Sequence, residues 1–352
     1  MAADYRPADC AEAVTSGSTG QPLKFYIDKR SLAFRFGLNL RTLEFSAYRV
    51  GRKLLQVSPP LSGKLESGPK TKLIDVLLRR LTVPPFDPDM VGKFRQMVDF
   101  RPEAIVGYTS YIKSLADLAQ EAPLAFAIPS IMTTSEQLLP QTRKKLGDIF
   151  GGRVFDQYGS VETGRAATEC VAGSGYHVNV EGVFIEVVTA DGRDAPPGEM
   201  GEMIVTNLMN YAHPFIRYRV GDFAASAPAK ACSCGRELPL LERIGGRLND
   251  IIVLPGGRRV MPEYFYLSLR DIGGLGQFQI IQTAPTALRV LYAKEGLFDE
   301  AKRAAVEAEY RRYLRGLRIT WEPVKDIAAI SGKHRHIVSL RDTTLTTPSE
   351  TR

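Results

Sequence analysis

A stretch near the amino terminus is rich in the residue types that can surround a small anion. In the run Thr15-Ser16-Gly17-Ser18-Thr19-Gly20, every residue is a glycine or carries a hydroxyl group. Glycine permits positive φ angles and close backbone approach, so hydroxyl and N–H groups can converge on one anion. A flexible serine–glycine linker has a similar composition, and this stretch alone is compatible with either interpretation.

Four cysteines include a closely spaced pair, Cys232 and Cys234. One intervening residue is too few for an ordinary structural disulfide but suits a metal-binding knuckle. With Cys170 and His177, the pair would supply three thiolates and one imidazole, a tetrahedral ligand set for a structural Zn²⁺. The alternative is that the cysteines are small buried side chains and the histidine lies at the surface. Cys10 is left over as a free thiol.

Two polar clusters follow short apolar stretches that have the pattern of buried strands. Ser135 and Glu136 follow the apolar residues 127–133, and Asp156-Gln157-Tyr158-Gly159-Ser160-Val161-Glu162 follows Val154 and Phe155. Strands alternate with helices across this half of the chain, which predicts a parallel sheet covered by helices. Because ligands bind beyond the carboxyl ends of the strands in such sheets, we expect both clusters to lie at that edge.

The pattern of short strands and amphipathic helices predicts an α/β fold. Expected helices lie at 31–48 (with Ser31 as N-cap), 71–80, 87–99, 110–120 and 139–150, and expected strands at 23–28, 53–57, 104–108, 127–133 and 154–156. From Tyr176 a β-rich subdomain follows, with strands at 178–188, 200–207 and 215–220. A small α+β unit comes last, with helices at 263–271 and 297–315 and strands at 277–283, 287–293 and 317–323. We predict a large domain (1–249), a small mobile C-terminal domain (250–341) and a disordered tail (342–352).

Composition narrows the class of protein. The chain has 352 residues, of which 44% are hydrophobic and 24% charged, as in an ordinary globular protein. A net charge of +7 favours anionic ligands such as nucleotides, but the basic residues are dispersed, so no nucleic-acid surface is expected. No stretch approaches the roughly 18 apolar residues of a membrane helix, and no signal peptide opens the chain. We therefore expect a cytoplasmic protein with no membrane partner.

Five stretches in a fixed order resemble the motifs of the adenylate-forming superfamily of acyl-CoA synthetases and luciferases. They are the runs at 15–20, 156–162, 218–222 (Tyr-Arg-Val-Gly-Asp), 246–250 (Gly-Arg-Leu-Asn-Asp) and 331–333 (Ser-Gly-Lys). Three further features resemble the phenylacetate–CoA ligase and CapK-like branch: Phe100-Arg101-Pro102 with Gly107-Tyr108, Glu169-Cys170 with His177, and Cys232-Ser233-Cys234-Gly235-Arg236. The resemblance covers nearly the whole chain. Each motif alone is weak evidence for the family, and the resemblance rests on finding all five in the family's order.

The resemblance implies a reaction in which a carboxylate attacks the α-phosphate of ATP and pyrophosphate leaves. Residues 15–20 would cradle the β- and γ-phosphates, and Glu162 would bind Mg²⁺ with the phosphate oxygens. Lys333, on the small domain, would neutralise charge at the α-phosphate and the carboxylate. Asp250 would be the hinge between the domains. Without the resemblance, Glu162 would be an N-terminal helix charge, Lys333 an exposed lysine and Asp250 a loop acid.

The nucleoside half of the site is implied in the same way. Asp222 would accept hydrogen bonds from the ribose hydroxyls, with Arg247 nearby. The remaining contacts with the adenine and the substrate carboxylate would come from Ser135, Glu136, Asp156, Gln157, Tyr158 and Gly159. Alone, Asp222 after Gly221 has the pattern of a turn residue.

Three departures from the family pattern bear on these assignments. A lysine usually lies beside the proline of the phosphate loop, whereas here Lys24 lies two residues after Pro22 and either substitutes for it or faces solvent. Where the family has an arginine three residues after the final lysine, this chain has His336, with Arg335 one position earlier. Only fourteen residues precede Thr15, in place of a helical segment, which implies a trimmed chain, a partner covering that surface or a more open pocket.

The leading hypothesis is an ATP-dependent carboxylate ligase that forms an acyl-adenylate from an aryl or acyl acid. The acyl group then passes to a thiol such as CoA. One alternative keeps the adenylate and uses an amine acceptor; another is a nucleotide-binding protein that has lost catalysis. The expected partners are a small carboxylic acid, CoA or an amine, and a second copy or another subunit over the N-terminal face.

Overall fold

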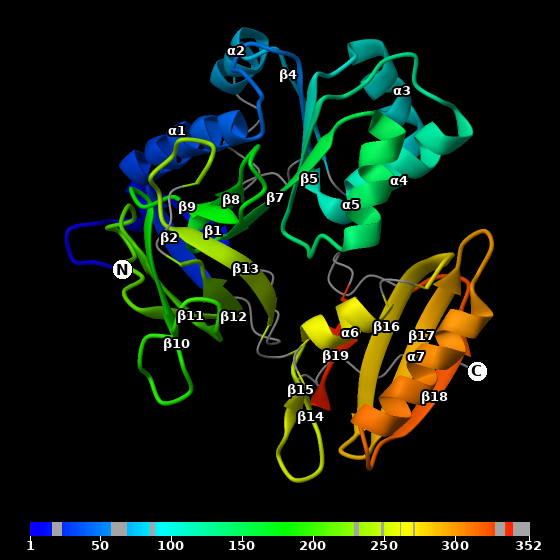
Figure 1. Ribbon diagram of the computed structural model, residues 1–352. Helices are drawn as coiled ribbons and strands as arrows, with labels where there is room; N and C mark the ends of the chain where they lie inside the picture. Colours follow the sequence, from blue (N-terminus) through cyan, green and yellow to red (C-terminus); the bar gives the residue numbers. More distant parts are fainter. Residues whose placement is uncertain are drawn as a thin grey trace, which may run out of the picture. The chain divides into compact units, whose positions relative to one another are not determined.

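The computed structural model describes residues 1–15, 23–57, 69–84, 89–228, 232–247, 250–260, 262–269, 272–327 and 335–340. These residues form two compact units (Figure 1). The first holds the described residues up to 220 together with 224–244, and the second holds 221–223 and the described residues from 245 onward. Within this described part of the chain, no helix is long and apolar enough to cross a membrane.

An eleven-stranded sheet organises the first unit, in the order β10-β11-β12-β13-β9-β8-β7-β6-β5-β3-β4 (Figure 1). Five neighbouring strands are parallel: β3 (Leu54–Val57), β4 (Arg80–Val83), β5 (Ala104–Tyr108), β6 (Ser130–Thr134) and β7 (Arg153–Ser160). The others are β8 (Gly164–Glu169), β9 (Tyr176–Val178), β10 (Val183–Val188), β11 (Met200–Asn207), β12 (Tyr218–Ser226) and β13 (Leu240–Arg247). The turn between β7 and β8 is where the sheet changes from parallel to antiparallel pairing.

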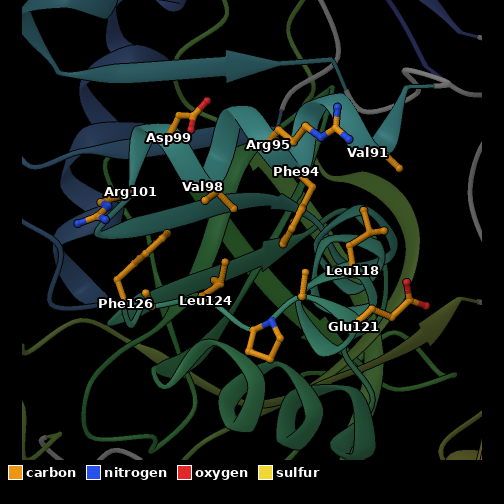
Figure 2. Close-up of a pocket in the computed structure, with 13 residues that line it drawn as sticks. Val91, Phe94, Arg95, Val98, Asp99, Arg101, Leu118, Glu121, Leu124 and Phe126 are labelled. Atoms are coloured by element: carbon orange, nitrogen blue, oxygen red, sulfur yellow. The ribbon is translucent and has the colours of Figure 1, made fainter.

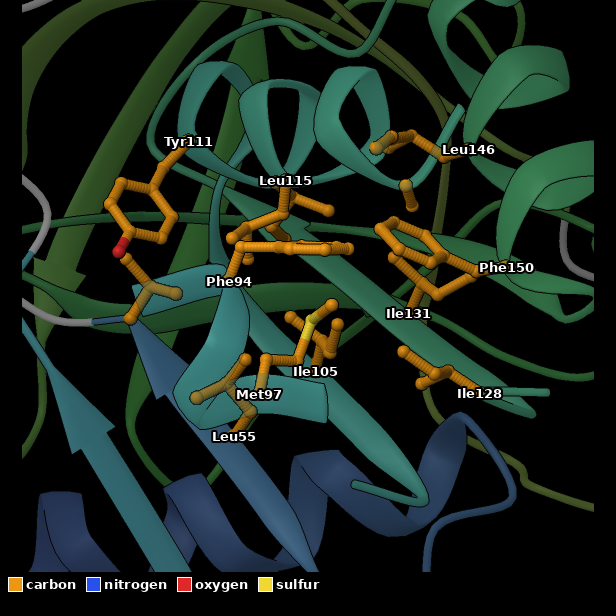
Figure 3. Close-up of a cluster of buried hydrophobic side chains, with 14 of the residues drawn as sticks. Leu55, Phe94, Met97, Ile105, Tyr111, Leu115, Ile128, Ile131, Leu146 and Phe150 are labelled. Atoms are coloured by element: carbon orange, nitrogen blue, oxygen red, sulfur yellow. The ribbon is translucent and has the colours of Figure 1, made fainter. Parts of the chain in front are cut away.

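Helices cover both faces of the parallel strands. They are α1 (Lys29–Phe45), α2 (Pro69–Leu77), α3 (Met90–Phe100), α4 (Thr109–Glu121) and α5 (Pro140–Phe150). Ile105 of β5 joins a core with side chains of α3, α4 and α5 (Figure 3). Its neighbour Val106 joins a second core with Leu43 of α1. Because successive strand residues point to opposite faces, α1 covers the face opposite to α3, α4 and α5.

A separate hairpin precedes α1. A short 3₁₀ helix (Pro7–Asp9) leads into β1 (Cys10–Val14), which pairs antiparallel with β2 (Lys24–Asp28). Phe25 and Ile27 of β2 are buried against Phe215. The hairpin therefore places the ends of the predicted phosphate loop on a packed two-stranded support.

The second unit contains a four-stranded sheet in the order β18-β17-β16-β19 and a two-stranded hairpin, β14-β15. Its elements are β14 (Ile252–Val253), β15 (Arg259–Val260), α6 (Pro262–Leu269), β16 (Leu275–Ala284), β17 (Ala287–Lys294), α7 (Glu300–Tyr313), β18 (Arg318–Pro323) and β19 (Ile337–Val338). The two helices meet where the hydroxyl groups of Ser268 and Tyr310 lie 2.7 Å apart. The predicted tail at 342–352 and the loop at 58–68 lie outside the described residues.

The predicted fold class is confirmed, with several local corrections. The N-cap of α1 is Asp28 rather than Ser31, because the Asp28 carboxylate accepts a hydrogen bond from the Ser31 N–H at 2.7 Å. The helix expected to reach Arg80 ends at Leu77, and Arg80 begins an edge strand. The β-rich part is not separate, because β8, β9 and β13 continue the main sheet. Strand β8 escaped prediction because its apolar residues are alanines, which favour strands weakly.

Candidate active site

Thr15 closes the base of the predicted phosphate loop. Its N–H donates to the Leu23 carbonyl at 3.0 Å, and the Leu23 N–H donates to the Thr15 hydroxyl oxygen at 2.9 Å. Ser16, Gly17, Ser18, Thr19 and Gly20 lie outside the described residues, so phosphate binding by this loop stays a prediction.

Lys24, which could have replaced the missing loop lysine, has a different partner. Its Nζ lies 2.7 Å from Glu12 Oε2 across the hairpin, and more than half of its side chain is exposed. The hydrogen bond to Glu12 raises the pKa of Lys24. Lys24 is therefore engaged on an exposed strand face next to the loop.

Glu162 lies in the tight turn between β7 and β8. Gly159 lies so close to Gly164 that an added Cβ would approach the Gly164 carbonyl oxygen to 2.3 Å, and Gly164 itself has a φ of +69°. Only glycine meets both conditions without strain. Inside the turn, the hydroxyls of Ser160 and Thr163 lie 3.1 Å apart, and the Ser160 N–H donates to Thr163 Oγ1 at 3.2 Å. The turn is thus well defined, and it fixes the backbone of Glu162.

Two side chains from distant elements hold this turn. Arg35 of α1 donates to the carbonyls of Val161 at 2.8 Å and Glu162 at 2.9 Å. Asn207, at the end of β11, donates to the Glu162 carbonyl at 2.6 Å. Burial lowers the pKa of Arg35 to about 10, and Glu162 acts in the opposite direction, so the guanidinium stays charged at neutral pH. The Glu162 carboxylate accepts a hydrogen bond from the Tyr218 hydroxyl at 3.3 Å.

The segment after β11 connects the Glu162 turn to the hairpin that carries the phosphate loop. Asn207 Oδ1 accepts hydrogen bonds from the N–H groups of Met209 and Asn210. Asn210 in turn donates to the Tyr26 carbonyl of β2 at 2.9 Å and accepts from the Asp28 N–H at 3.4 Å. Both asparagines are buried. A continuous hydrogen-bonded path therefore joins the hairpin to the turn.

Asp156 and Gln157, predicted to contact the nucleotide, are engaged inside the fold. Asp156 accepts hydrogen bonds from the hydroxyls of Tyr176 at 2.9 Å and Thr133 at 3.0 Å. Burial, together with the nearby charge of Glu169, raises the pKa of Asp156 to about 6.

Gln157 is buried beneath α1. Its amide donates to the hydroxyls of Thr42 and Thr168, both at 3.2 Å. Next in the strand, Tyr158 packs against the antiparallel half of the core. The side chains of β7 therefore alternate between the sheet's two covered faces rather than converging on one ligand.

Ser135 and Glu136 follow the carboxyl end of β6, as predicted. Ser135 adopts a left-handed conformation, with a φ of +70°. The Glu136 carboxylate accepts from the backbone N–H of Ser110 at 2.6 Å and from its hydroxyl at 2.9 Å. An acidic side chain at a helix N-terminus satisfies free N–H groups and the helix dipole. In this structure Glu136 therefore caps α4.

Asp222 lies within β12 immediately after Gly221, whose φ is +79°. Arg247 is the last residue of β13. The ribose role of Asp222 and the role of Arg247 stay predictions, as does that of Lys333, which lies outside the described residues.

Asp250, the predicted hinge residue, forms an ion pair within the second unit. Its Oδ1 lies 2.8 Å from Nη2 of Arg335, and both side chains are about 15% exposed or less. His336 packs on Phe278 with ring centroids 4.7 Å apart. Arg335 is therefore bound to Asp250 in this structure, and one residue separates Arg335 from Lys333 in sequence.

We expect Arg335→Met to lower the free energy of unfolding of the second unit by about 3 kcal/mol, because losing one partner leaves the other charge in a buried site. Arg289→Met is the matched control, since it breaks a 2.7 Å ion pair with Glu322 in which both side chains are 40% exposed or more. The control should cost less than about 1 kcal/mol. Denaturant titration measures both, and equal losses would contradict a special role for the Asp250 pair.

The four predicted metal ligands come together from three parts of the chain. One ligand atom each from Cys170, His177, Cys232 and Cys234 lies within 4.8 Å of every other. Cys170 Sγ is 3.7 Å from Cys232 Sγ, and Cys234 Sγ is 3.3 Å from His177 Nε2. His177 is fully buried, so the alternative of a surface histidine is wrong.

Burial and hydrogen bonds shift the pKa values of the cluster residues in different directions. Burial raises the pKa of Cys170 to about 11. Burial also opposes ionisation of Cys234, but hydrogen bonds from Arg236 and from the other two thiols lower its pKa to about 7. Burial lowers the pKa of His177, which favours a neutral imidazole. Three thiolates and a neutral imidazole at these distances would fit a tetrahedral Zn²⁺, whose binding would displace the thiol protons.

A cavity of about 700 Å³ lies between α3, α4 and the segment that follows α4 (Figure 2). Its lining includes Phe94, Leu118 and Phe126. The segment through Phe126 leads into the amino end of β6, whereas Ser135 follows the carboxyl end. The cavity therefore opens at the edge of the sheet away from the predicted site.

Arg35, Asn207, Asn210 and Tyr218 were not predicted as site residues. The asparagine pair after an apolar strand was a visible turn signal. Arg35 carried no such signal, because an arginine in an amphipathic helix has the pattern of a solvated residue. Its partners Val161 and Glu162 lie more than 120 residues later in the sequence.

No family model matches the chain. Among curated proteins, the chain is 29% identical over 233 residues to the phenylacetate–coenzyme A ligase of Thermus thermophilus, a match that covers 63% of this chain and 49% of that protein. It is 27% identical over 160 residues to protein CapK of Staphylococcus aureus, over 45% of this chain and 34% of that protein. The chain spans about half the length of the curated ligases that it matches.

The fold is similar to solved ligase structures. A 2-hydroxyisobutyryl-CoA ligase in the postadenylation state, in complex with R3-HIB-AMP, matches with a TM-score of 0.73 and 20% identity over 96% of this chain and 75% of that chain. The amide bond synthetase McbA of Marinactinospora thermotolerans matches with a TM-score of 0.65 and 15% identity over 94% of this chain and 69% of that chain. The chain is thus similar in sequence to phenylacetate–CoA ligases and to CapK, and it shares its fold with adenylate-forming ligases.

Proposed function

We propose that this protein is an ATP-dependent ligase that activates an organic acid as an acyl-adenylate and then transfers the acyl group to a thiol such as CoA. The observation that carries the proposal is the hydrogen-bonded path from the β1–β2 hairpin through Asn210 and Asn207 to the backbone of Glu162. A phosphate loop and a carboxylate ligand for Mg²⁺ must keep a fixed separation to act on one triphosphate. The names of the sequence relatives support the same reaction.

In the first step, a carboxylate oxygen of the acid attacks the α-phosphorus and the bond to pyrophosphate breaks. Thr15 and the loop residues Ser16–Gly20 would hold the β- and γ-phosphates through N–H and hydroxyl groups. Mg²⁺, held at Glu162, would supply positive charge to the phosphate oxygens. Lys333 would balance charge at the α-phosphate, and Asp222 would accept hydrogen bonds from the ribose. In the second step, a thiol sulfur attacks the acyl carbon and AMP leaves.

Two further assignments belong to this proposal. The cluster of Cys170, His177, Cys232 and Cys234 would hold a structural Zn²⁺ that ties β8 and β9 to the knuckle at 232–235. Asp250 would be the hinge about which the second unit moves between the two steps. ATP and CoA are cytoplasmic metabolites, so we propose that the protein acts there.

The expected result is pyrophosphate release that requires both ATP and an added acid. Purified protein is screened against a panel of aryl and acyl acids, with and without CoA, and acyl-CoA is measured separately. If no acid elicits pyrophosphate although ATP binds, the protein is a nucleotide-binding protein and not a ligase. Replacing CoA by amines tests the amide-forming alternative, which the similarity to McbA supports.

A further inference from the structure

A charged side chain that follows the Glu162 turn in sequence has no carboxylate partner among the residues that the structure describes. Arg165 is the second residue of β8, and its Nη1 lies 3.9 Å from the thioether sulfur of Met132. A thioether is only a weak hydrogen-bond acceptor. Among the residues that the structure describes, no oxygen atom accepts a hydrogen bond from this guanidinium and no carboxylate pairs with it.

Two other partly buried arginines of the first unit have oxygen atoms as hydrogen-bond partners. Arg143 makes two hydrogen bonds to the Glu169 carboxylate, at 2.8 and 2.9 Å. Arg35 donates to two carbonyl groups, and the charges of Glu162 and Asp28 favour its ionised form. Burial alone lowers the pKa of Arg165 to about 10, so this group is charged at neutral pH. A charge removed from water without a partner is costly, so a group of this kind is a candidate for a functional site.

The position of Arg165 connects it to the proposed reaction. Its side chain reaches from β8 across β7 to Met132 of β6, two residues before the carboxyl end of that strand. The β7–β8 turn with Glu162 precedes Arg165 by only three residues. Ligands of such sheets bind at this edge. The residue as a whole is partly exposed.

We propose that Arg165 is a specificity-determining residue that binds a second, non-reacting carboxylate of the acid substrate. This inference rests on the proposed ligase function and narrows the substrate class to dicarboxylic acids. The planar guanidinium offers two parallel N–H donors that match the two oxygens of a carboxylate. The bound carboxylate supplies the negative charge that none of the described neighbours of Arg165 provides. The other carboxylate stays free to attack the α-phosphorus.

The test compares pairs of acids that differ by one carboxylate: succinic with propionic acid, and 4-carboxyphenylacetic with phenylacetic acid. In wild-type protein, kcat/KM for pyrophosphate release is higher for the dicarboxylic member of at least one pair. Arg165→Met reduces that preference about 10- to 100-fold, the range for a lost hydrogen bond to a charged group. The change falls mainly on KM, because this contact is the same in the ground state and the transition state. Arg165→Lys retains part of the preference.

A matched control variant and a melting temperature separate substrate binding by Arg165 from a merely structural role. Arg153→Met removes an exposed arginine at the start of β7, whose Nη2 donates to the Val171 carbonyl at 2.6 Å, and it leaves the preference unchanged. Arg165→Met melts at the same temperature as wild type or higher, because an uncompensated charge is removed. Equal losses for both members of each pair, or a wild-type protein without any preference, overturn the inference.

A binding measurement distinguishes failure of the ligase function from failure of the dicarboxylate site. If no acid elicits pyrophosphate, the melting temperature is measured with and without succinic acid. If succinic acid raises the melting temperature of the wild type but not that of Arg165→Met, the dicarboxylate site is supported although the ligase function fails. Absence of a shift overturns both.

Discussion

Glu162→Gln is expected to reduce acid-dependent pyrophosphate release about 100- to 1000-fold at a fixed Mg²⁺ concentration. This is the loss seen when one preorganised electrostatic contact with the reacting groups is removed. A neutral amide oxygen is a weaker ligand for Mg²⁺ than a carboxylate, so the Mg²⁺ concentration for half-maximal rate should also rise. The loss is expected mainly in kcat, because charge separates as pyrophosphate leaves.

The surroundings of Glu162 make this substitution informative. Arg35 and Asn207 bind the backbone carbonyl of residue 162, and these contacts do not depend on the side chain. The Tyr218 hydroxyl, 3.3 Å from Oε1, can donate equally to an amide oxygen. Glutamine therefore changes the charge while the turn keeps its contacts.

Glu44→Gln is the matched control, since Glu44 is an exposed residue of α1. It should leave both the rate and the Mg²⁺ dependence unchanged. Rates are measured by coupled pyrophosphate detection over a Mg²⁺ titration with the best acid from the panel. If Glu162→Gln retains the wild-type Mg²⁺ dependence, Glu162 is a turn residue and the metal assignment is wrong.

The elements that sequence predicts well are those whose burial is uniform or clearly periodic. All five residues of β5 are buried, and this apolar run was predicted with its bounds correct. The alternation of apolar residues that indicates a strand is weaker in β8, which contains few β-branched residues, and in β19, which spans two residues. Short strands of this kind form because neighbouring strands supply their hydrogen bonds, and this pairing is invisible in local sequence.

The same distinction applies to the site. The juxtaposition of Cys170, His177, Cys232 and Cys234 could be predicted from residue types that suit a metal, whereas the role of Glu162 came from its place in a motif and stays a prediction. The support of Glu162 could not be predicted, because Arg35 and Asn207 come from elements 127 and 45 residues away. Likewise, Gln157 was predicted as a nucleotide contact by its place in a motif. In the structure its side chain is buried, with hydrogen bonds to Thr42 of α1 and Thr168 of β8 that the motif did not indicate.

The second large effect is expected at the metal cluster. Cys232→Ser should reduce bound zinc from about one equivalent per chain to a small fraction and lower the free energy of unfolding by more than about 4 kcal/mol. Effects of this size are exceptional for one substitution and are typical of a lost metal or disulfide. Three remaining ligands hold Zn²⁺ less tightly, and metal-binding free energy is also folding free energy when the unfolded chain has no site.

The packing around the cluster explains why the loss should reach beyond the knuckle. Phe45, the last residue of α1, packs edge-on against His177 with ring centroids 5.8 Å apart. The Arg236 guanidinium carbon lies 4.2 Å from the Phe45 ring centroid, and the Val171 N–H donates to the Phe45 carbonyl at 3.1 Å. The cluster therefore packs against the carboxyl end of α1. The same helix contains Arg35, which binds the Glu162 turn.

Cys10→Ser is the control, because Cys10 is the one cysteine outside the cluster. It should leave both zinc content and stability unchanged. Elemental analysis after dialysis measures the metal, and denaturant unfolding of the full chain measures the stability. A strong chelator should lower the wild-type unfolding free energy toward that of Cys232→Ser and have little effect on Cys232→Ser itself. If the purified chain is stable without metal, and Cys232→Ser unfolds like Cys10→Ser, then the thiols and His177 form an ordinary buried cluster held by packing alone.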